Sequence, residues 1–209
     1  SYHGKSFGAL SLTFNPKYRK AFSPLVEKVS FASFGDMDSL RSAIDEDTAL
    51  IILEPIQGES GIIVAPDGFL QEVRNLCDEK GILLVFDEIQ AGLGRTGRLW
   101  AGEHWNTVPD ILCLAKGIAG GVPMGATLVR PDILAAISKG EHSSTFGGNP
   151  ISCAAGIAAL TSITEDGLIE NSKKMGEIFR EGLEKLKEKH TMIRDIRGKG
   201  LMIGIEMKF

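Results

Sequence analysis

The sequence lacks several features that would place it in particular protein classes. No apolar run reaches the ~18 residues that a membrane-spanning helix needs, and no basic, apolar and small-residue pattern of a secretory signal peptide begins the chain. Positive charge is not in excess, since the formal net charge is −4. These absences predict a cytoplasmic protein that acts without a membrane partner and without nucleic acid.

Cysteine and histidine are also sparse and scattered. Cys77, Cys113 and Cys153 lie far apart in apolar surroundings, which is typical of buried free thiols and not of a disulfide framework. The four histidines show no metal-ligand spacing, so no metal site is predicted. Tandem repeats and low-complexity segments are absent from the sequence as well.

What is present is the composition of a soluble globular domain, with 43% hydrophobic and 24% charged residues in 209 positions. Continuous apolar runs at 49–53, 82–86 and 111–115 predict strands covered on both faces. Helical patterns at 36–46 and 66–79, the second closed by a glycine, alternate with them. This rhythm predicts an α/β fold built on a mostly parallel sheet.

The second half of the sequence predicts more helix. Segment 151–164 is apolar nearly all round, as expected of a buried helix, and 166–189 is amphipathic with one core-facing stripe. The other expected elements are a polar loop around 15–18, a strand over 123–130, a short helix over 131–138, a connector over 192–200 and a strand over 201–207.

Charged residues follow two of the apolar runs. Asp87 ends the run at 82–86, and Lys116 ends the run at 111–115. Ligands of open α/β sheets bind outside the carboxyl ends of the strands. Either residue alone would be an ordinary surface charge, but glycines follow Lys116 closely and let backbone approach a ligand. A carboxylate and an amine in one pocket suit pyridoxal 5'-phosphate (PLP), because lysine forms a Schiff base with its aldehyde and an acid holds its pyridine nitrogen protonated.

Several motifs spread over nearly the whole chain support this chemistry. With them the sequence resembles the class III PLP-dependent aminotransferases, of the acetylornithine and ornithine aminotransferase type. The motifs are Tyr2-His-Gly-Lys5, Glu54-Pro-Ile-Gln-Gly-Glu59, Asp87-Glu-Ile-Gln90, Gly92-Leu-Gly-Arg-Thr-Gly97, Lys116-Gly117, Ser144-Thr-Phe-Gly-Gly-Asn-Pro150 and Arg197-Gly-Lys-Gly200.

The resemblance implies a fold type I PLP-transferase large domain over residues 1–190, truncated at its N-terminal side. Residues 191–209 would be a connector and the first strand of a small C-terminal domain. Members of the family are considerably longer, so the resemblance also implies a fragment. A turn that holds the cofactor phosphate and an arginine that holds a substrate carboxylate would lie outside it.

The resemblance also implies roles for individual residues around the cofactor. Lys116 would be the catalytic lysine that holds PLP, and Asp87 would pair with the pyridine nitrogen. Tyr2 and Ile89 would pack on the two faces of the ring, and Gln90 would hydrogen-bond its phenolic oxygen.

Four further residues are implied in shared or substrate sites. Thr145 would donate to the cofactor phosphate of a neighbouring subunit, which makes a homodimer with a shared active site. Ser144 would lie beside the substrate, and Glu59 would act as a gate that pairs with the missing arginine. Lys5 stands where acetylornithine-type members commonly have arginine, and lysine offers a point charge in place of a bidentate fork.

The implied activity is PLP-dependent, ping-pong transamination of an ω-amino group with 2-oxoglutarate/glutamate, in arginine or lysine biosynthesis. Small amino acids such as N-acetylornithine, ornithine or a carrier-linked precursor would be substrates. Two alternatives share the motifs: a 4-aminobutyrate aminotransferase or glutamate-1-semialdehyde aminomutase, and a catalytically incomplete fragment. The glycine-rich segment 92–97 lacks the GK[ST] ending of a nucleotide-binding loop.

Overall fold

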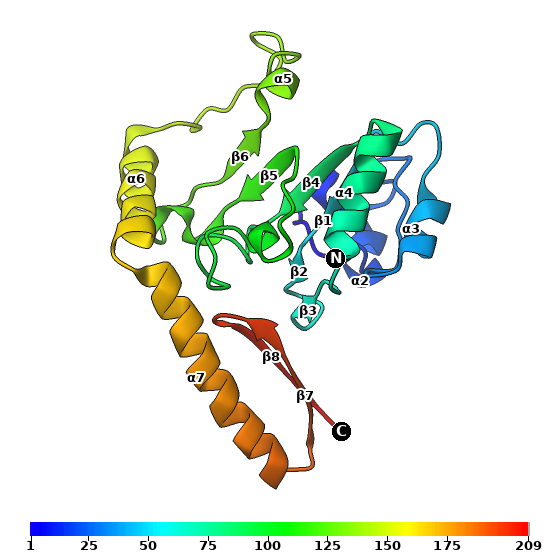
Figure 1. The fold of residues 1–209 in the computed structure, drawn as a ribbon. Helices are drawn as coiled ribbons and strands as arrows, with labels where there is room; N and C mark the ends of the chain where they lie inside the picture. The colour runs from blue at the N-terminus through cyan, green and yellow to red at the C-terminus, as the bar shows by residue number, and fades with distance from the viewer. Residues whose placement is uncertain (209) are drawn as a thin grey trace.

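A four-stranded sheet with the order β1-β4-β5-β6 forms the centre of the computed structural model, which describes residues 1–208 (Figure 1). β1, β4 and β5 run parallel, and β6 pairs antiparallel with β5. The strands are β1 (Leu50–Leu53), β2 (Ile56–Gln57), β3 (Ile63–Val64), β4 (Leu83–Asp87), β5 (Ile111–Leu114), β6 (Ala126–Val129), β7 (Ile193–Lys199) and β8 (Met202–Met207). The predicted α/β class with a mostly parallel central sheet is confirmed.

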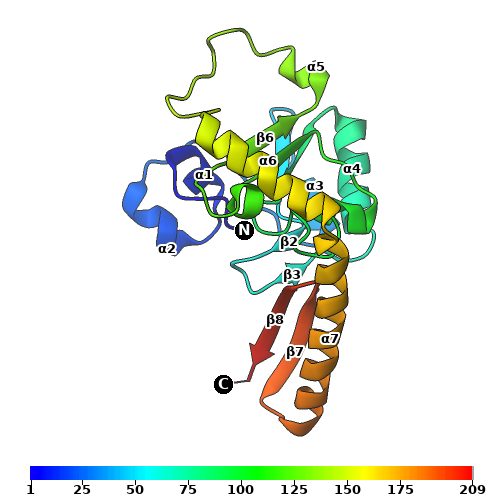
Figure 2. The same cartoon turned by 90° about the vertical axis from the view of Figure 1, so that its left-hand side faces the viewer.

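Helices pack around this sheet and extend below it (Figures 1 and 2). The α-helices are α1 (Phe7–Leu12), α2 (Pro16–Arg19), α3 (Met37–Ala43), α4 (Phe69–Lys80), α5 (Pro131–Leu134), α6 (Pro150–Glu165) and α7 (Leu168–Lys189). The 3-10 helices are η1 (Lys20–Phe22), η2 (Ala101–Trp105) and η3 (Lys116–Ala119). Among residues 1–208, no helix is both long enough and apolar enough to span a membrane.

Local sequence signals account for the start of α3 and the end of α4. Asp36 caps α3 by accepting hydrogen bonds from two backbone N–H groups at 3.0 Å. Gly81 ends α4 in the left-handed region at φ 68°. Leu70 and Val73 of α4, and Phe86 of the next strand β4, are completely buried. Burial of each such side chain stabilises the fold by about 1.5–3 kcal/mol.

The strand register brings three strand ends to one level. Leu53 of β1 lies opposite Phe86, and Asp87 of β4 lies opposite Cys113 of β5. Glu54, Asp87 and, just past β5, Lys116 therefore leave the sheet at the same edge. This edge is the place where open α/β sheets bind ligands.

A hairpin of β7 and β8 lies beside α7, apart from the central sheet (Figures 1 and 2). The carbonyl of Arg95 accepts hydrogen bonds from Leu201 N at 3.0 Å and from Ser172 Oγ at 2.9 Å. Arg197 Nε donates to the carbonyl of Gly61 at 2.8 Å. These bonds tie the hairpin and α7 to the loop that follows β4 and to the turn between β2 and β3.

Three expectations about local structure are wrong. The expected connector 192–200 contains β7, whose charged side chains pair across the hairpin, as Arg197 does with Glu206 at 2.6 Å. The expected loop at 15–18 contains the start of α2, which Asn15 caps and Pro16 opens.

The third wrong expectation is that α6 is a buried helix. Ile151 is 76% exposed and Ile157 is 68% exposed, while Ser152 and Gly156 are the buried positions of this helix. Small residues on one side, such as Gly156, pack against η3 and Met124. The remaining apolar surface of α6 has no cover from the rest of residues 1–208.

Candidate active site

Asp87, at the end of β4, is a buried carboxylate with two hydrogen-bond partners. Its Oδ2 lies 2.9 Å from His3 Nδ1, and its Oδ1 accepts from Ile89 N at 3.0 Å. Both side chains of the His3–Asp87 pair are almost completely buried. The two contacts fix the carboxylate in one orientation at the sheet edge. His3 was missed by the sequence reasoning, although it lies inside the Tyr2-His-Gly-Lys5 motif.

Lys116 leaves β5 in a backbone conformation that is uncommon for lysine. Its φ is 47°, in the left-handed region, which costs a non-glycine residue on the order of 1–3 kcal/mol and often marks a functional site. The side chain is exposed, and Nζ donates to Gln90 Oε1 at 2.7 Å. Gln90 belongs to the same short segment as Asp87, which it follows closely in the chain. The structure therefore brings the predicted lysine, amide and carboxylate to one place.

Glu54, which follows β1, is a second buried carboxylate at this edge. Its Oε1 accepts from Tyr2 N and its Oε2 accepts from Gly58 N, each at 3.0 Å. Glu59 of the same motif is a site residue predicted from the sequence, whereas Glu54 is not. The residue types alone could not reveal these contacts, because both partners are backbone groups.

Tyr2 and Lys5 both contact the ring of Tyr18. The ring of Tyr2 packs edge-to-face on Tyr18, with 5.8 Å between ring centroids. Lys5 Nζ lies 5.3 Å from the centroid of the same Tyr18 ring. The aromatic residue expected beside the cofactor and the cation expected beside the substrate therefore lie near each other.

Other predicted site residues lie apart from this group. Glu59 is exposed in the turn between β2 and β3. Ser144 and Thr145 are exposed in the long loop between α5 and α6, which extends away from the sheet (Figures 1 and 2). Ser144 Oγ accepts from Gly147 N at 3.0 Å. Within residues 1–208, no hydrogen bond joins Ser144 or Thr145 to Lys116.

Glu88, next to Asp87, points away from this group and into the core. It accepts hydrogen bonds from Ala101 N at 2.6 Å and from Gly102 N at 2.8 Å, and so holds the start of η2. Burial raises the pKa of Glu88 to about 7, although the two N–H groups act in the opposite direction. The side chain therefore changes its charge near neutral pH.

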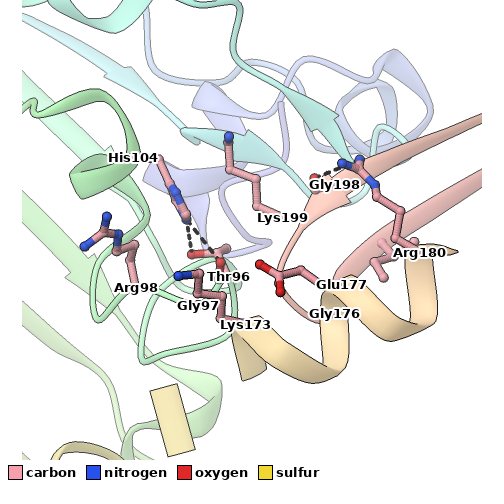
Figure 3. Close-up of a pocket in the computed structure, with 12 residues that line it drawn as sticks. Thr96, Gly97, Arg98, His104, Lys173, Gly176, Glu177, Arg180, Gly198 and Lys199 are labelled. Atoms are coloured by element: carbon pink, nitrogen blue, oxygen red, sulfur yellow. Dashed lines mark hydrogen bonds between the residues drawn. The ribbon is translucent and has the colours of Figure 1, made fainter. Parts of the chain in front are cut away.

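A cavity of about 250 Å³ lies away from Lys116, between the 92–100 loop, α7 and the β7–β8 hairpin (Figure 3). Charged side chains from these segments surround it, among them Arg98, Lys173 and Lys199. His104 Nε2 contacts Thr96 Oγ1 at 3.0 Å there. Burial and, to a smaller degree, the charge of Lys199 lower the pKa of His104 to about 4. None of the predicted site residues lines this cavity.

The described part of the chain holds no cluster of three or more His, Cys, Asp or Glu side chains suited to a metal ion. The cysteines are free; Cys77 is buried, whereas Cys113 and Cys153 are half-buried. The sheet edge instead offers a fixed carboxylate, a primary amine, an amide and a tyrosine ring. Such a set suits a small aromatic ligand that carries a carbonyl group and a ring nitrogen.

Comparisons with known proteins agree with this geometry. An acetylornithine aminotransferase of Methanopyrus kandleri is 47% identical over 206 residues, which are 99% of this chain and 52% of that protein. The [LysW]-aminoadipate semialdehyde/glutamate semialdehyde transaminase of Sulfurisphaera tokodaii is 44% identical over the whole chain and 54% of its own length. The chain thus spans about half the length of the curated relatives it matches.

Solved structures show the same likeness. The ornithine aminotransferase of Toxoplasma gondii matches all of this chain and 50% of its own, with a TM-score of 0.96 and 37% identity. An amine transaminase from an uncultivated Pseudomonas species, solved in a PLP-bound form, matches with a TM-score of 0.91 and 32% identity. The family model for class-III aminotransferases matches residues 1–209. On its motifs, its fold and these likenesses, the chain belongs to the class-III aminotransferase family.

Proposed function

We propose that the protein to which this chain belongs is a PLP-dependent aminotransferase. The observation that carries the proposal is the position of Asp87 and Lys116, which adjacent parallel strands deliver to one edge of the sheet. The carboxylate is buried and oriented, and the amine is exposed and hydrogen-bonded to Gln90. A lysine and an acid in this arrangement are the two groups that PLP chemistry requires of a protein.

The residues at the edge fit the cofactor. Asp87 has lone pairs left beyond its bonds to His3 and Ile89 N, so it can accept a hydrogen bond from a ring N–H group. Tyr2 and Ile89 would contact the faces of the ring, and Gln90 would donate to its phenolic oxygen. When bound, PLP supplies an electron sink for the carbon next to the reacting nitrogen.

Lys116 would have two tasks in turn. It would hold the cofactor aldehyde through Nζ, and once displaced by a substrate amine it would carry a proton from one carbon to another. Gln90 already orients Nζ by a 2.7 Å hydrogen bond. A general base must lie within hydrogen-bond reach of the proton it moves, and the backbone bend at Lys116 sets that reach.

We further propose an ω-amino group as amino donor and 2-oxoglutarate as acceptor, in a ping-pong reaction. The names of the relatives support this substrate class, because N-acetylornithine and ornithine carry an ω-amino group, and the semialdehyde group in the third name is a carbonyl group that accepts one. Lys5 would attract a substrate carboxylate, Ser144 would lie beside the substrate, and Glu59 would switch between the two half-reactions.

Two copies of the chain would complete the site. The exposed apolar surface of α6 and Phe146, which is 80% exposed, support a dimer contact close to the loop that holds Thr145. Thr145 would then bind the cofactor phosphate of the partner. Residues 191–209 would begin a second, smaller domain, of which the β7–β8 hairpin is the first part.

The direct test is covalent trapping. Purified protein mixed with PLP and reduced with borohydride should carry the cofactor on the peptide that contains Lys116, and should show a visible absorbance band before reduction. The Lys116→Ala variant should show neither. Lys189→Ala, an exposed lysine at the end of α7, is the matched control and should label like the wild type. Label on another lysine would contradict the assignment.

The substrate class is tested by the half-reaction. Excess N-acetylornithine or ornithine, added without 2-oxoglutarate, should convert the absorbance band to that of the aminated cofactor, and 2-oxoglutarate should restore it. Conversion by 4-aminobutyrate alone, or isomerisation of glutamate-1-semialdehyde, would replace the proposed substrate with one of the alternatives.

A further inference from the structure

Glu54 joins two segments that are distant in sequence and that both belong to the candidate site. Glu54 is 6% exposed, and its two carboxylate oxygens each accept one backbone hydrogen bond at 3.0 Å. One donor is Tyr2 N, 52 residues away, and the other is Gly58 N, four residues on. No ion pair with Glu54 is present among residues 1–208, so backbone amides are its partners.

Each of these two backbone partners belongs to, or contacts, a residue with a role in the proposed reaction. Tyr2 carries the ring proposed to lie on the cofactor. Gly58 precedes Glu59, and a Cβ at Gly58 would overlap the side chain of Gln90, the residue that binds Lys116 Nζ. The backbone around Gly58 is thus in close contact with the Lys116–Gln90 pair.

We propose that Glu54 is a positioning residue that sets the place of Tyr2 and of the β2–β3 turn relative to Lys116 and Gln90. The role of the positioned groups rests on the proposed function, whereas the hydrogen bonds of Glu54 do not. Glu54 and Asp87 follow neighbouring strands at the same level, and they hold consecutive residues, Tyr2 and His3.

The chemistry of the carboxylate explains why another polar residue would not serve. A carboxylate is acceptor-only, so both of its oxygens match N–H donors, and its charge makes both bonds stronger than neutral ones. Glutamine keeps one acceptor and places an NH₂ group against the second N–H. Glu54→Gln should therefore release either Tyr2 N or Gly58 N without removing side-chain volume.

Hydrogen exchange followed by mass spectrometry tests the contacts directly, on the purified full chain and without any cofactor. In Glu54→Gln, exchange should become about tenfold faster or more in peptides that contain Tyr2 or Gly58. Asp110→Asn is the matched control, because Asp110 is also a buried carboxylate that accepts a backbone N–H group, from Leu84, at the opposite end of the sheet. That control should leave both peptides unchanged.

The kinetic readout separates positioning from general stability. Glu54→Gln should raise the dissociation constant for PLP and the KM for the amino donor about tenfold, with a smaller fall in kcat. Asp110→Asn should lower the melting temperature without this split. Glu54→Asp keeps the charge with a shorter reach, should show the same changes to a smaller degree, and replaces the glutamine variant if that variant does not fold.

The outcomes distinguish the two proposals. Unchanged exchange at both Tyr2 and Gly58, or equal effects of the Glu54 and Asp110 variants on KM, would overturn the positioning role. Faster exchange in a protein whose wild type does not react with PLP would uphold the Glu54 contacts and overturn the proposed function.

Discussion

His3 Nδ1 lies 2.9 Å from Asp87 Oδ2, across 84 residues of sequence, and the two side chains are only 3% and 7% exposed. The contact joins the start of the chain to the end of the central strand β4. It also gives the carboxylate a partner on the side opposite Ile89 N.

His3→Ala should therefore lower both stability and cofactor affinity. Loss of the partner of a buried carboxylate costs about 1–3 kcal/mol of unfolding free energy, and a less ordered Asp87 should bind PLP more weakly. Urea unfolding and PLP titration measure the two effects. His142→Ala, at an exposed loop position, should change neither. Equal PLP affinity in wild type and His3→Ala would show that His3 does not orient Asp87.

Two glycines of α7 should respond in opposite directions to the same change. A Cβ at Gly176 would overlap the backbone of Gly200, whereas one at Gly182 would meet open space. Gly176→Ala should lose about 1–3 kcal/mol of stability, because the hairpin must move. Gly182→Ala should gain about 0.5–1 kcal/mol, because alanine favours the helix. Chemical unfolding checks both, and a loss of the same size at both positions would contradict the packing.

The stability of the protein should depend on pH through Glu88. Its folded pKa of about 7 lies above the ordinary value of 4.5, so the folded state binds more protons between these values. This contribution is complete below about pH 4.5 and is lost as pH rises through 7, by up to about 1.4 kcal/mol per pH unit. Urea unfolding between pH 5 and pH 8 should show a smaller decline in Glu88→Gln than in wild type. Parallel profiles would show that Glu88 keeps its charge.

His104 should act with the opposite sign. Its folded pKa of about 4 lies below the ordinary 6.5, so its contribution is complete above pH 6.5 and is lost as pH falls toward 4. His104→Gln keeps a donor for the carbonyl of Thr96 and should flatten the acid side of the stability profile. The same unfolding series, extended to pH 4, measures it. An unchanged acid limb would place the imidazole in contact with water.

The apolar surface of α6 gives a test of assembly. Ile157 is 68% exposed, and a charge at this position should disfavour a contact with a second copy. Light scattering should give the mass of a dimer for the wild type and that of a monomer for Ile157→Glu. Ile178→Glu is the control, because this isoleucine of α7 is 54% exposed on another helix. A dimer that survives Ile157→Glu would exclude α6 from the interface.

The three parallel strands of the large sheet could be predicted because each is an apolar run bounded by polar residues, as at Ile82–Phe86. β7 could not, since Arg194, Asp195 and Arg197 interrupt its apolar positions. Arg194 and Arg197 pair with Glu206 on β8, and Asp195 pairs with Arg197. The prediction that α6 is buried was wrong for a related reason. An apolar helix shows that some surface must cover it, but not whether that surface belongs to the same chain.

Some residues of the candidate site could likewise be predicted from the sequence, and others could not. Asp87 and Lys116 follow apolar runs, and parallel strands bring such ends together, so their proximity could be inferred. His3 and Glu54 could not be assigned, because their contacts cross 84 and 52 residues and, for Glu54, involve backbone N–H groups that every sequence contains.

The same long separations bear on how the molecule reaches its folded form. Loop-closure entropy opposes contacts between distant residues until the intervening segments have folded, so the sheet forms before Tyr2 and His3 can dock on Glu54 and Asp87. During refolding, the capacity to bind a ligand at this edge should therefore arise no earlier than the sheet itself.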